Sequence, residues 1–140
     1  MAGKLSPSER EAFLAAKHVA IISVDAGDGR APFAVPMWYL YEPGGLVTIL
    51  TSPQSLKARL IKAAGAYTLA VQDEEPPYRY VTVSGPLVET VDAADPAERL
   101  AQAQRYLGEE GGRGFMRETG DQPRSAYRMR PAVWRSFDFS

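Results

Sequence analysis

The sequence has no cysteine, no asparagine and a single histidine, His18. Without cysteine there are no disulfides, no thiolate catalysis, no iron–sulfur cluster and no cysteine-ligated zinc. One histidine cannot build a histidine-rich metal site, so we expect no metal centre. The lack of cysteine also agrees with a cytoplasmic protein, which is the location that we predict.

A strong net charge is missing as well, because 16 Lys and Arg stand against 17 Asp and Glu. A general nucleic-acid or anionic-membrane binder would need a broad basic surface, so neither partner is expected. No segment approaches the ~20 consecutive apolar residues that span a bilayer. The first residues also lack the apolar core of a signal peptide.

What is present is ordinary for a globular chain. Of the 140 residues, 45% are hydrophobic and 24% are charged. This length fits one domain, residues 1–140, and is sufficient to bury a core without cross-links.

Three helices are predicted from their start signals. Ser6, Pro7 and Glu9 have the spacing of an N-cap, a first-turn proline and a capping box. The predicted helices run from there to about residue 16, from 53 to about 64, and from 95 to about 107. In the second, Leu56, Leu60 and Ile61 are expected on the buried face. The glycine-rich, charged segment 108–124 is expected to be a mobile loop.

Six extended segments, rich in β-branched and aromatic residues, are predicted as strands. They cover residues 18–26, 31–42, 46–52, 66–73, 78–91 and 125–139. Pro32 and Pro36 belong at an edge or bulge because they lack amide hydrogens, and Gly85-Pro86 and Pro131 are expected to bend their strands. Strands linked without helices favour antiparallel pairing, and closure into a barrel would remove exposed edges. The predicted fold is mostly β with flanking α: a six-stranded antiparallel barrel with three short helices.

The stretch "ILTSPQSLKARLIKA", residues 49–63, leads a strand into a helix start. Free amide hydrogens and partial positive charge at a helix N-terminus favour anions. Ser52 and Ser55 add hydroxyls, and Lys57 adds a charge on the inward side. Arg59 lies roughly 200° away around an ideal helix, so it cannot face the same small anion. The residues alone fit an anion site and a capped surface helix equally well.

Aromatic side chains are the second signal. They gather on three predicted strands, at Trp38, Tyr39 and Tyr41, at Tyr78 and Tyr80, and at Trp134 and Phe137. Alternation places Trp38 and Tyr39 on opposite faces of their strand. Such side chains could surround a planar phosphorylated cofactor, or could equally pack a core and a dimer contact.

Two other features have weaker chemical meaning. His18 could act as a general base, but no G-x-S-x-G motif accompanies it, and most lone histidines are structural. Asp73, Glu74 and Glu75 could bind a metal through oxygen, but they fit a solvated turn between two strands better. We therefore assign no catalytic residue.

With these residues in place, the chain resembles the pyridoxamine 5′-phosphate oxidase-like superfamily, the split barrels that bind FMN or a deazaflavin. The resemblance covers nearly the whole chain. It rests on the order and spacing of four segments: "HVAIISVDAGDGRAPFAVPMWYLYE", "TSPQSLKARLIKA", "PPYRYVTVSGPLVETV" and "RMRPAVWRSFDF".

The resemblance implies a homodimer with a cofactor at the subunit interface. It assigns the cofactor phosphate to Ser52, Ser55 and Lys57, with Arg59 near them. The ring system would lie along the backbone around Val35, Pro36, Met37 and Trp38 and around Ile49, Leu50 and Thr51. The partner subunit would contribute from Tyr78, Arg79 and Tyr80 and from the last strand, with Arg128, Arg130 and Trp134 as candidates.

The sequence departs from true pyridoxamine phosphate oxidases, which are longer and carry basic residues on the second strand. Here residues 31–40 are neutral, which disfavours that activity and favours the branch that uses the deazaflavin coenzyme F-420 over FMN. The function that the resemblance implies is a flavin- or deazaflavin-dependent oxidoreductase acting on a small organic substrate. Alternatives are a flavin, deazaflavin or haem carrier without turnover, and a barrel whose cofactor site has decayed.

Overall fold

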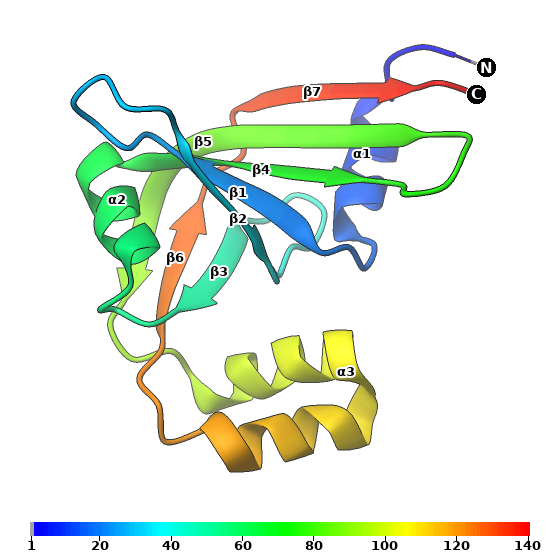
Figure 1. Ribbon diagram of the computed structural model, residues 1–140. Coiled ribbons are helices and arrows are strands. Elements are labelled where there is room, and N and C mark those ends of the chain that lie inside the picture. The colour runs from blue at the N-terminus through cyan, green and yellow to red at the C-terminus, as the bar shows by residue number, and fades with distance from the viewer. Residues whose placement is uncertain (1) are drawn as a thin grey trace.

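The computed structural model describes residues 2–140, in which seven strands and three helices form (Figure 1). The helices are α1 (Pro7–Ala15), α2 (Leu56–Ala64) and α3 (Pro96–Thr119). The strands are β1 (Ala20–Val24), β2 (Phe33–Met37), β3 (Val47–Thr51), β4 (Ala66–Gln72), β5 (Arg79–Val91), β6 (Ser125–Met129) and β7 (Val133–Asp138).

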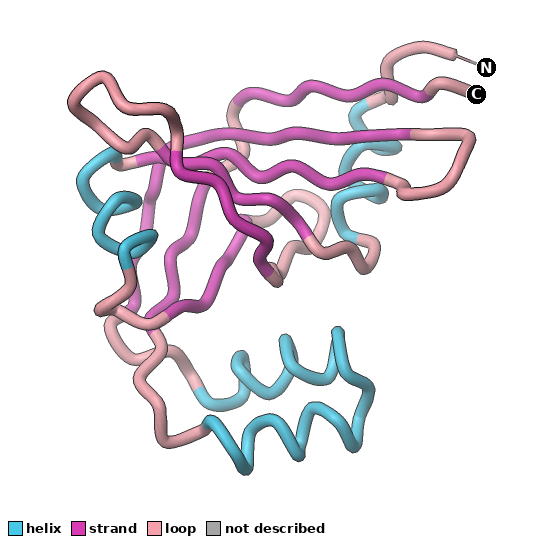
Figure 2. Tube along the Cα trace, viewed as in Figure 1, coloured by secondary structure: helices cyan, strands magenta, loops and turns pink. Residues whose placement is uncertain are grey.

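All strand pairs are antiparallel, in the order β2-β1-β4-β5-β6-β3, with β7 added to β5. The sheet curls so that β3 and β6 run across the other strands, as in a half-closed barrel (Figures 1 and 2). The predicted fold class is confirmed. Pro36 lies on β2, at the edge of the sheet, as its missing amide hydrogen requires.

β5 is shared by both halves of the curled sheet. Residues up to Pro86 pair with β4, and residues from Leu87 onward pair with β6, with a register shift between Leu87 and Glu89. The bend predicted at Gly85-Pro86 therefore coincides with a change of neighbour. The last predicted strand is two strands, because the chain leaves β6 near Pro131 and pairs again with the first part of β5 as β7.

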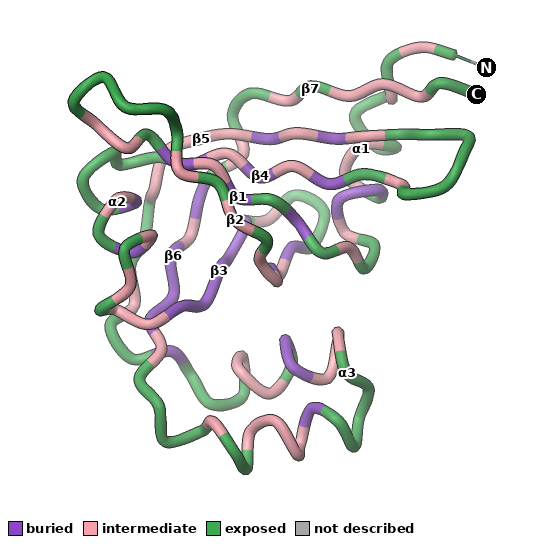
Figure 3. Tube along the Cα trace, in the orientation of Figure 1, coloured by how far each residue is buried: buried purple, intermediate pink, exposed green. Residues whose placement is uncertain are grey.

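Buried side chains fill the inside of the curl. β3 is buried at every position, β6 at all but one, and burial alternates along β4 (Figure 3). Tyr67 extends from β4 across the interior, and its hydroxyl lies 3.1 Å from the carbonyl oxygen of Val47 and 3.0 Å from that of Tyr127. Burial raises the pKa of Tyr67, so this hydroxyl stays a donor that ties the two halves together.

The ends of α1 agree with the sequence. The Ser6 hydroxyl accepts from the Glu9 amide, and the Glu9 carboxylate accepts from the Ser6 amide, which is the predicted capping box. In α2, the predicted buried face is partly wrong. Ile61 is fully buried, but Leu56 is 48% exposed and Ala58 takes the inward position. Leu56 is the first residue of the helix, and its side chain is exposed to solvent.

The predicted loop 108–124 is wrong over most of its length, because α3 continues to Thr119. Gly108 has a φ of 80° and breaks α3 into two helical halves that fold back on each other (Figure 1). A Cβ on Gly112 would lie 2.6 Å from the amide nitrogen of Gln104, so this glycine allows the halves to touch. The glycines that indicated a loop instead permit close helix packing. Within residues 2–140 no helix is long and apolar enough to span a membrane.

Candidate functional site

The junction of β3 and α2 is built by hydroxyls that bind the backbone. The Ser55 hydroxyl caps α2 by accepting from the Ala58 amide at 3.2 Å, and it donates to the Ser52 carbonyl at 2.8 Å. The Ser52 hydroxyl accepts from the Gln54 amide at 3.2 Å. The two serines therefore shape the start of the helix, which fixes the direction of its first amide hydrogens.

Donors remain unused at this junction. The amides of Leu56 and Lys57 donate no hydrogen bond within residues 2–140, and the partly buried Lys57 ammonium forms neither an ion pair nor a hydrogen bond there. Arg59 is exposed on the same helix. The start of α2 thus combines unused donors with positive charge, which is an arrangement that can bind a phosphate.

A cleft of about 320 Å³ opens between the ends of β2 and β3 and the α3 hairpin. Its lining residues are Val19, Pro36, Met37, Trp38, Leu50, Arg99, Gln102, Ala103, Phe115, Met116 and Arg124. The volume falls in the range of small-ligand pockets, roughly 300–1,000 Å³. No Asp, Glu or His is among the lining residues.

Aromatic contacts attach α3 to the sheet at one end of the cleft. Trp38 stacks on Tyr106 with ring centroids 4.8 Å apart and lies 5.5 Å from the ring of Phe115. The Tyr106 hydroxyl donates to the His18 carbonyl at 2.6 Å. Trp38 is therefore held between both halves of the hairpin while it lines the cleft.

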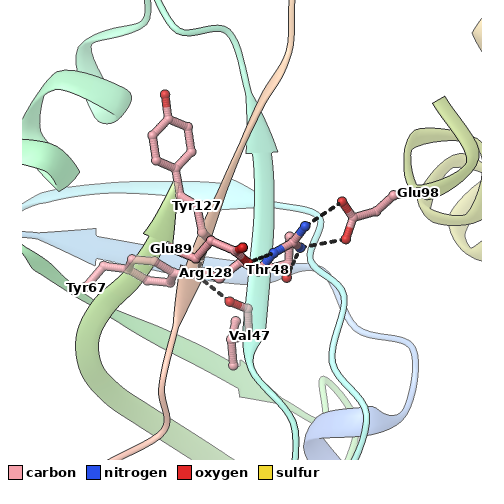
Figure 4. A network of polar contacts seen from close by, with 7 residues as sticks. All are labelled: Val47, Thr48, Tyr67, Glu89, Glu98, Tyr127 and Arg128. Atoms are coloured by element: carbon pink, nitrogen blue, oxygen red, sulfur yellow. Dashed lines mark hydrogen bonds and ion pairs between the residues drawn. The ribbon is translucent and has the colours of Figure 1, made fainter. Parts of the chain in front are cut away.

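A charged network attaches the start of α3 (Figure 4). The Arg128 guanidinium donates to both carboxylate oxygens of Glu98, at 2.7 and 3.2 Å, to the Thr48 hydroxyl at 2.9 Å, and to Glu89 at 2.7 Å. Hydrogen bonding to Glu98 raises the pKa of Arg128. Because its guanidinium is engaged within the chain, Arg128 acts here as a tether between β6, β3, β5 and α3.

Three polar residues of the cleft were missed by the sequence analysis: Arg99, Gln102 and Arg124. Arg99 donates to the carbonyls of Thr119 and Gly120. Burial, and then the charge of Arg124, lowers the pKa of Arg99. The β3–β6 pairing ends at Thr51 and Ser125, so Arg124 and Ser52, the neighbours of these two residues in the chain, adjoin the same end of the strand pair. The usable signal was the spacing of Arg99, Gln102 and Ala103, which places polar residues on the inward stripe of a helix.

The structure brings together part of the predicted site. Pro36, Met37, Trp38 and Leu50 line the cleft, and Thr51, Ser52, Ser55 and Lys57 form the adjoining junction. Ile49 is fully buried in the core, so only its backbone could contact a ligand, and the partly buried Val35 packs against the core.

The remaining predicted residues lie elsewhere in the chain. Arg79 forms an ion pair with Asp73 at 2.8 Å, and the Trp134 ring packs near Tyr41, beneath the Arg10 guanidinium. Tyr78 and Arg130 are exposed. Tyr80 lines a second, wider groove of about 790 Å³ that shares Val19 and Pro36 with the cleft. These residues were expected to act from a partner subunit.

His18 has a structural role, and the turn that contains Asp73, Glu74 and Glu75 forms no metal site with other described residues. The His18 Nε2 donates to the Phe13 carbonyl at 2.9 Å, and its ring lies 4.6 Å from the Phe13 ring. Burial lowers the pKa of His18, which favours the neutral ring. Within residues 2–140 no cluster of His, Cys, Asp or Glu could hold a metal ion.

Similarity to known proteins is visible in the fold of this chain. No protein-family model matches the chain, and no curated protein matches it in sequence. An F420 reductase of known structure aligns with a TM-score of 0.71 and 24% identity, over 89% of this chain and 94% of its own. A conserved hypothetical protein from Mycobacterium tuberculosis gives 0.72 and 19%, over 96% and 86% of the two chains.

An FAD-binding protein from Mesorhizobium loti aligns over 100% of this chain and 99% of its own, with a TM-score of 0.68 and 17% identity. These relatives share the curled antiparallel sheet described above. The chain therefore has the split-barrel fold that these structures share, as its sequence predicted.

Proposed function

We propose that this protein is an oxidoreductase that binds a flavin or deazaflavin cofactor, with coenzyme F-420 favoured over FMN, and acts on a small organic substrate. The observation that carries the proposal is the continuity of two features. The start of α2 offers unused donors beside the unpaired Lys57, and the preceding strand leads directly into the apolar cleft through Leu50.

The residues present fit a phosphorylated planar cofactor. The amides of Leu56 and Lys57 and the Lys57 ammonium would hold the phosphate, since charge-assisted hydrogen bonds are the strong ones. Pro36, Met37 and Leu50 offer an apolar surface for a ring system. When bound, such a cofactor supplies the hydride chemistry itself, and the protein supplies binding and orientation. The absence of acidic or histidine side chains from the cleft lining agrees with this division.

The preference for F-420 has two supports. Residues 31–40, which contain β2 at the border of the cleft, carry no charge, and an F420 reductase is among the similar structures. True pyridoxamine phosphate oxidases carry basic residues on that strand and this sequence does not, so pyridoxamine phosphate oxidation is not proposed.

A homodimer belongs to the same proposal. The wide groove next to the cleft exposes apolar side chains on the outer face of the sheet, with Val19 61% and Ile21 43% exposed. A second copy packed there would cover this surface and close one side of the cleft. Tyr80, which lines the groove, would then lie at the subunit interface.

The proposal is tested by titrating the purified protein with F-420 and, separately, with FMN, using fluorescence or calorimetry. We expect both to bind, F-420 more tightly. Reduced cofactor should then be consumed in the presence of an accepted substrate. If neither cofactor binds, the redox function is rejected.

Lys57 provides the sharper test. Lys57→Ala removes one charge-assisted contact, which is worth about 1.5–3 kcal/mol, or roughly a 10- to 100-fold loss of cofactor affinity. Lys62→Ala is the matched control, because Lys62 is an exposed lysine in the last turn of the same helix. Equal dissociation constants for the two variants would remove Lys57 from the phosphate site.

A second candidate is a carrier that binds cofactor without turnover, and the lack of an acid or base in the cleft is compatible with it. Haem fits less well, because His18 would have to give up its hydrogen bond to Phe13 to ligate iron through Nε2. Turnover of reduced cofactor separates the enzyme from the carrier, and a visible spectrum of the bound cofactor separates the carrier from a decayed site.

A further inference from the structure

We propose that the cleft beneath α3 binds a small apolar carboxylic acid, whose carboxylate is held by Arg99, Arg124 and Gln102. If the proposed function holds, this molecule is the substrate class of the oxidoreductase. The side chains proposed for the carboxylate line the cleft from α3 and from the segment that follows it, whereas Pro36, Met37 and Leu50, which we propose for the cofactor ring, line it from the sheet.

The first step of the argument is that two arginines in the cleft have no carboxylate partner in the described chain. Arg99 and Arg124 line one cleft, and neither has a carboxylate within ion-pair distance in residues 2–140. Their hydrogen bonds go to the neutral oxygens of Thr119, Gly120, Pro123 and Gln122. Asp121 is the acidic residue whose charge acts on Arg99. Two partly buried cations that repel each other in this way favour an anion between them.

The buried amide of Gln102 is the second, independent step. Gln102 is 9% exposed and lines the cleft one helical turn after Arg99. Its Oε1 is buried without a partner within residues 2–140. A carboxylate only accepts hydrogen bonds, so Gln102 would bind it by donating through Nε2, and a 180° turn of the amide brings Nε2 to the buried position that Oε1 now holds. A buried polar group left unpaired costs about 1–3 kcal/mol, which is a reason to expect a partner that is bound from outside the chain.

The third step is the nature of the anion. A guanidinium presents a planar fork that matches a carboxylate, and a carboxylate can accept about four hydrogen bonds. Beyond the polar group the lining is apolar, with Trp38, Phe115 and Met116 around a space of about 320 Å³. Because the cofactor ring would occupy the sheet side of this cleft, the acid that we propose for the α3 side is a small one. The acid-free lining would not repel its charge.

Ligand-observed NMR with benzoate tests the proposal, and benzamide serves as the neutral probe of the same shape. We expect benzoate to bind and benzamide to bind at least ~10-fold more weakly, because it lacks the charge. Arg124→Gln should weaken benzoate binding by ~10-fold or more without loss of the fold, since its own hydrogen bonds are local. Arg117→Gln, an exposed arginine in the last turn of α3, is the matched control.

Gln102→Leu keeps the volume and removes the buried amide. It should also weaken benzoate binding, while thermal unfolding shows the same or a higher midpoint, because an unpaired buried polar group is gone. Arg99 is a poorer variant, because it also holds the carbonyls at the end of α3.

The outcomes separate this proposal from the cofactor assignment. Benzoate that binds equally to wild type and Arg124→Gln overturns it, as does equal binding of benzoate and benzamide. If Arg124→Gln instead weakens F-420 or FMN as much as Lys57→Ala does, the arginine belongs to the cofactor phosphate and the proposal fails. Benzoate binding in a protein that binds neither cofactor would support the carboxylate site while rejecting the oxidoreductase.

Discussion

The attachment of α3 through Arg128 leads to a quantitative prediction about stability. Arg128 binds Glu98 through two hydrogen bonds in a partly buried site, where the side chains are 20% and 23% exposed. Its contact with Glu89 is equally short at 2.7 Å, but Glu89 is 54% exposed. One cation with two carboxylates of unequal burial therefore gives an internal comparison.

Burial decides the expected magnitudes. Glu98→Gln leaves the Arg128 guanidinium without its partly buried charged partner, which should lower the free energy of unfolding by about 1.5–3 kcal/mol. For a chain of this length, 1 kcal/mol shifts the midpoint by about 2–4 °C, so the midpoint should fall by roughly 3–12 °C. Glu89→Gln removes a solvent-screened pair and should cost less than about 1 kcal/mol.

The assay is thermal and urea denaturation of the single variants, of Arg128→Met, and of the two double variants. The double-mutant cycle isolates the Arg128–Glu98 coupling from the effect of the Glu98 charge on the helix start. We expect a larger coupling energy for Glu98 than for Glu89. Equal couplings, or a Glu98 coupling indistinguishable from zero, would refute the view that this network fixes α3 over the cleft.

Three further results are expected. Gly112→Ala should cost about 1–3 kcal/mol in denaturation, because its Cβ would lie 2.6 Å from the Gln104 amide nitrogen, whereas Gly114→Ala has room and should not. The midpoint should fall as pH drops below about 6.5, since burial lowers the pKa of His18 and the unfolded chain then binds the extra proton; a His18→Gln variant with an unchanged pH slope would contradict this. If the dimer is correct, Ile21→Glu should reduce the mass in ultracentrifugation to the 15.3 kDa of one chain, and the similarly exposed Leu107→Glu should not.

Local signals in the sequence were the most informative. The capping box at Ser6 and Glu9 depends on four neighbouring residues, and it forms as predicted. The edge position of Pro36 follows from its missing amide hydrogen. These features need no knowledge of distant contacts, which is why a single sequence could predict them.

Tertiary contacts account for what the sequence did not predict. Glycine is a weak helix former, so residues 109–119 resembled a loop, but they are helical and Gly112 packs closely on Gln104 of the first helical half. Leu56 fitted the apolar period of α2, but as the first residue of the helix it remains 48% exposed, while Ala58 is buried. Arg99, Gln102 and Arg124 come together only because the hairpin folds back beneath the sheet.

The shared strand β5 also bears on the order in which the molecule assembles. Its pairing with β4 is a hairpin between neighbouring segments, whereas β3 pairs with β6 over a long separation, as Thr48 and Arg128 are 80 positions apart. Closing a long loop costs more entropy than closing a short one and is therefore slower. We expect the β4–β5 hairpin to form first and the β3–β6 pairing to form later. Changes in the hairpin should then slow folding, while changes in the ladder should mainly speed unfolding. The cleft, which lies between the end of β3 and α3, would be completed in the final steps of folding.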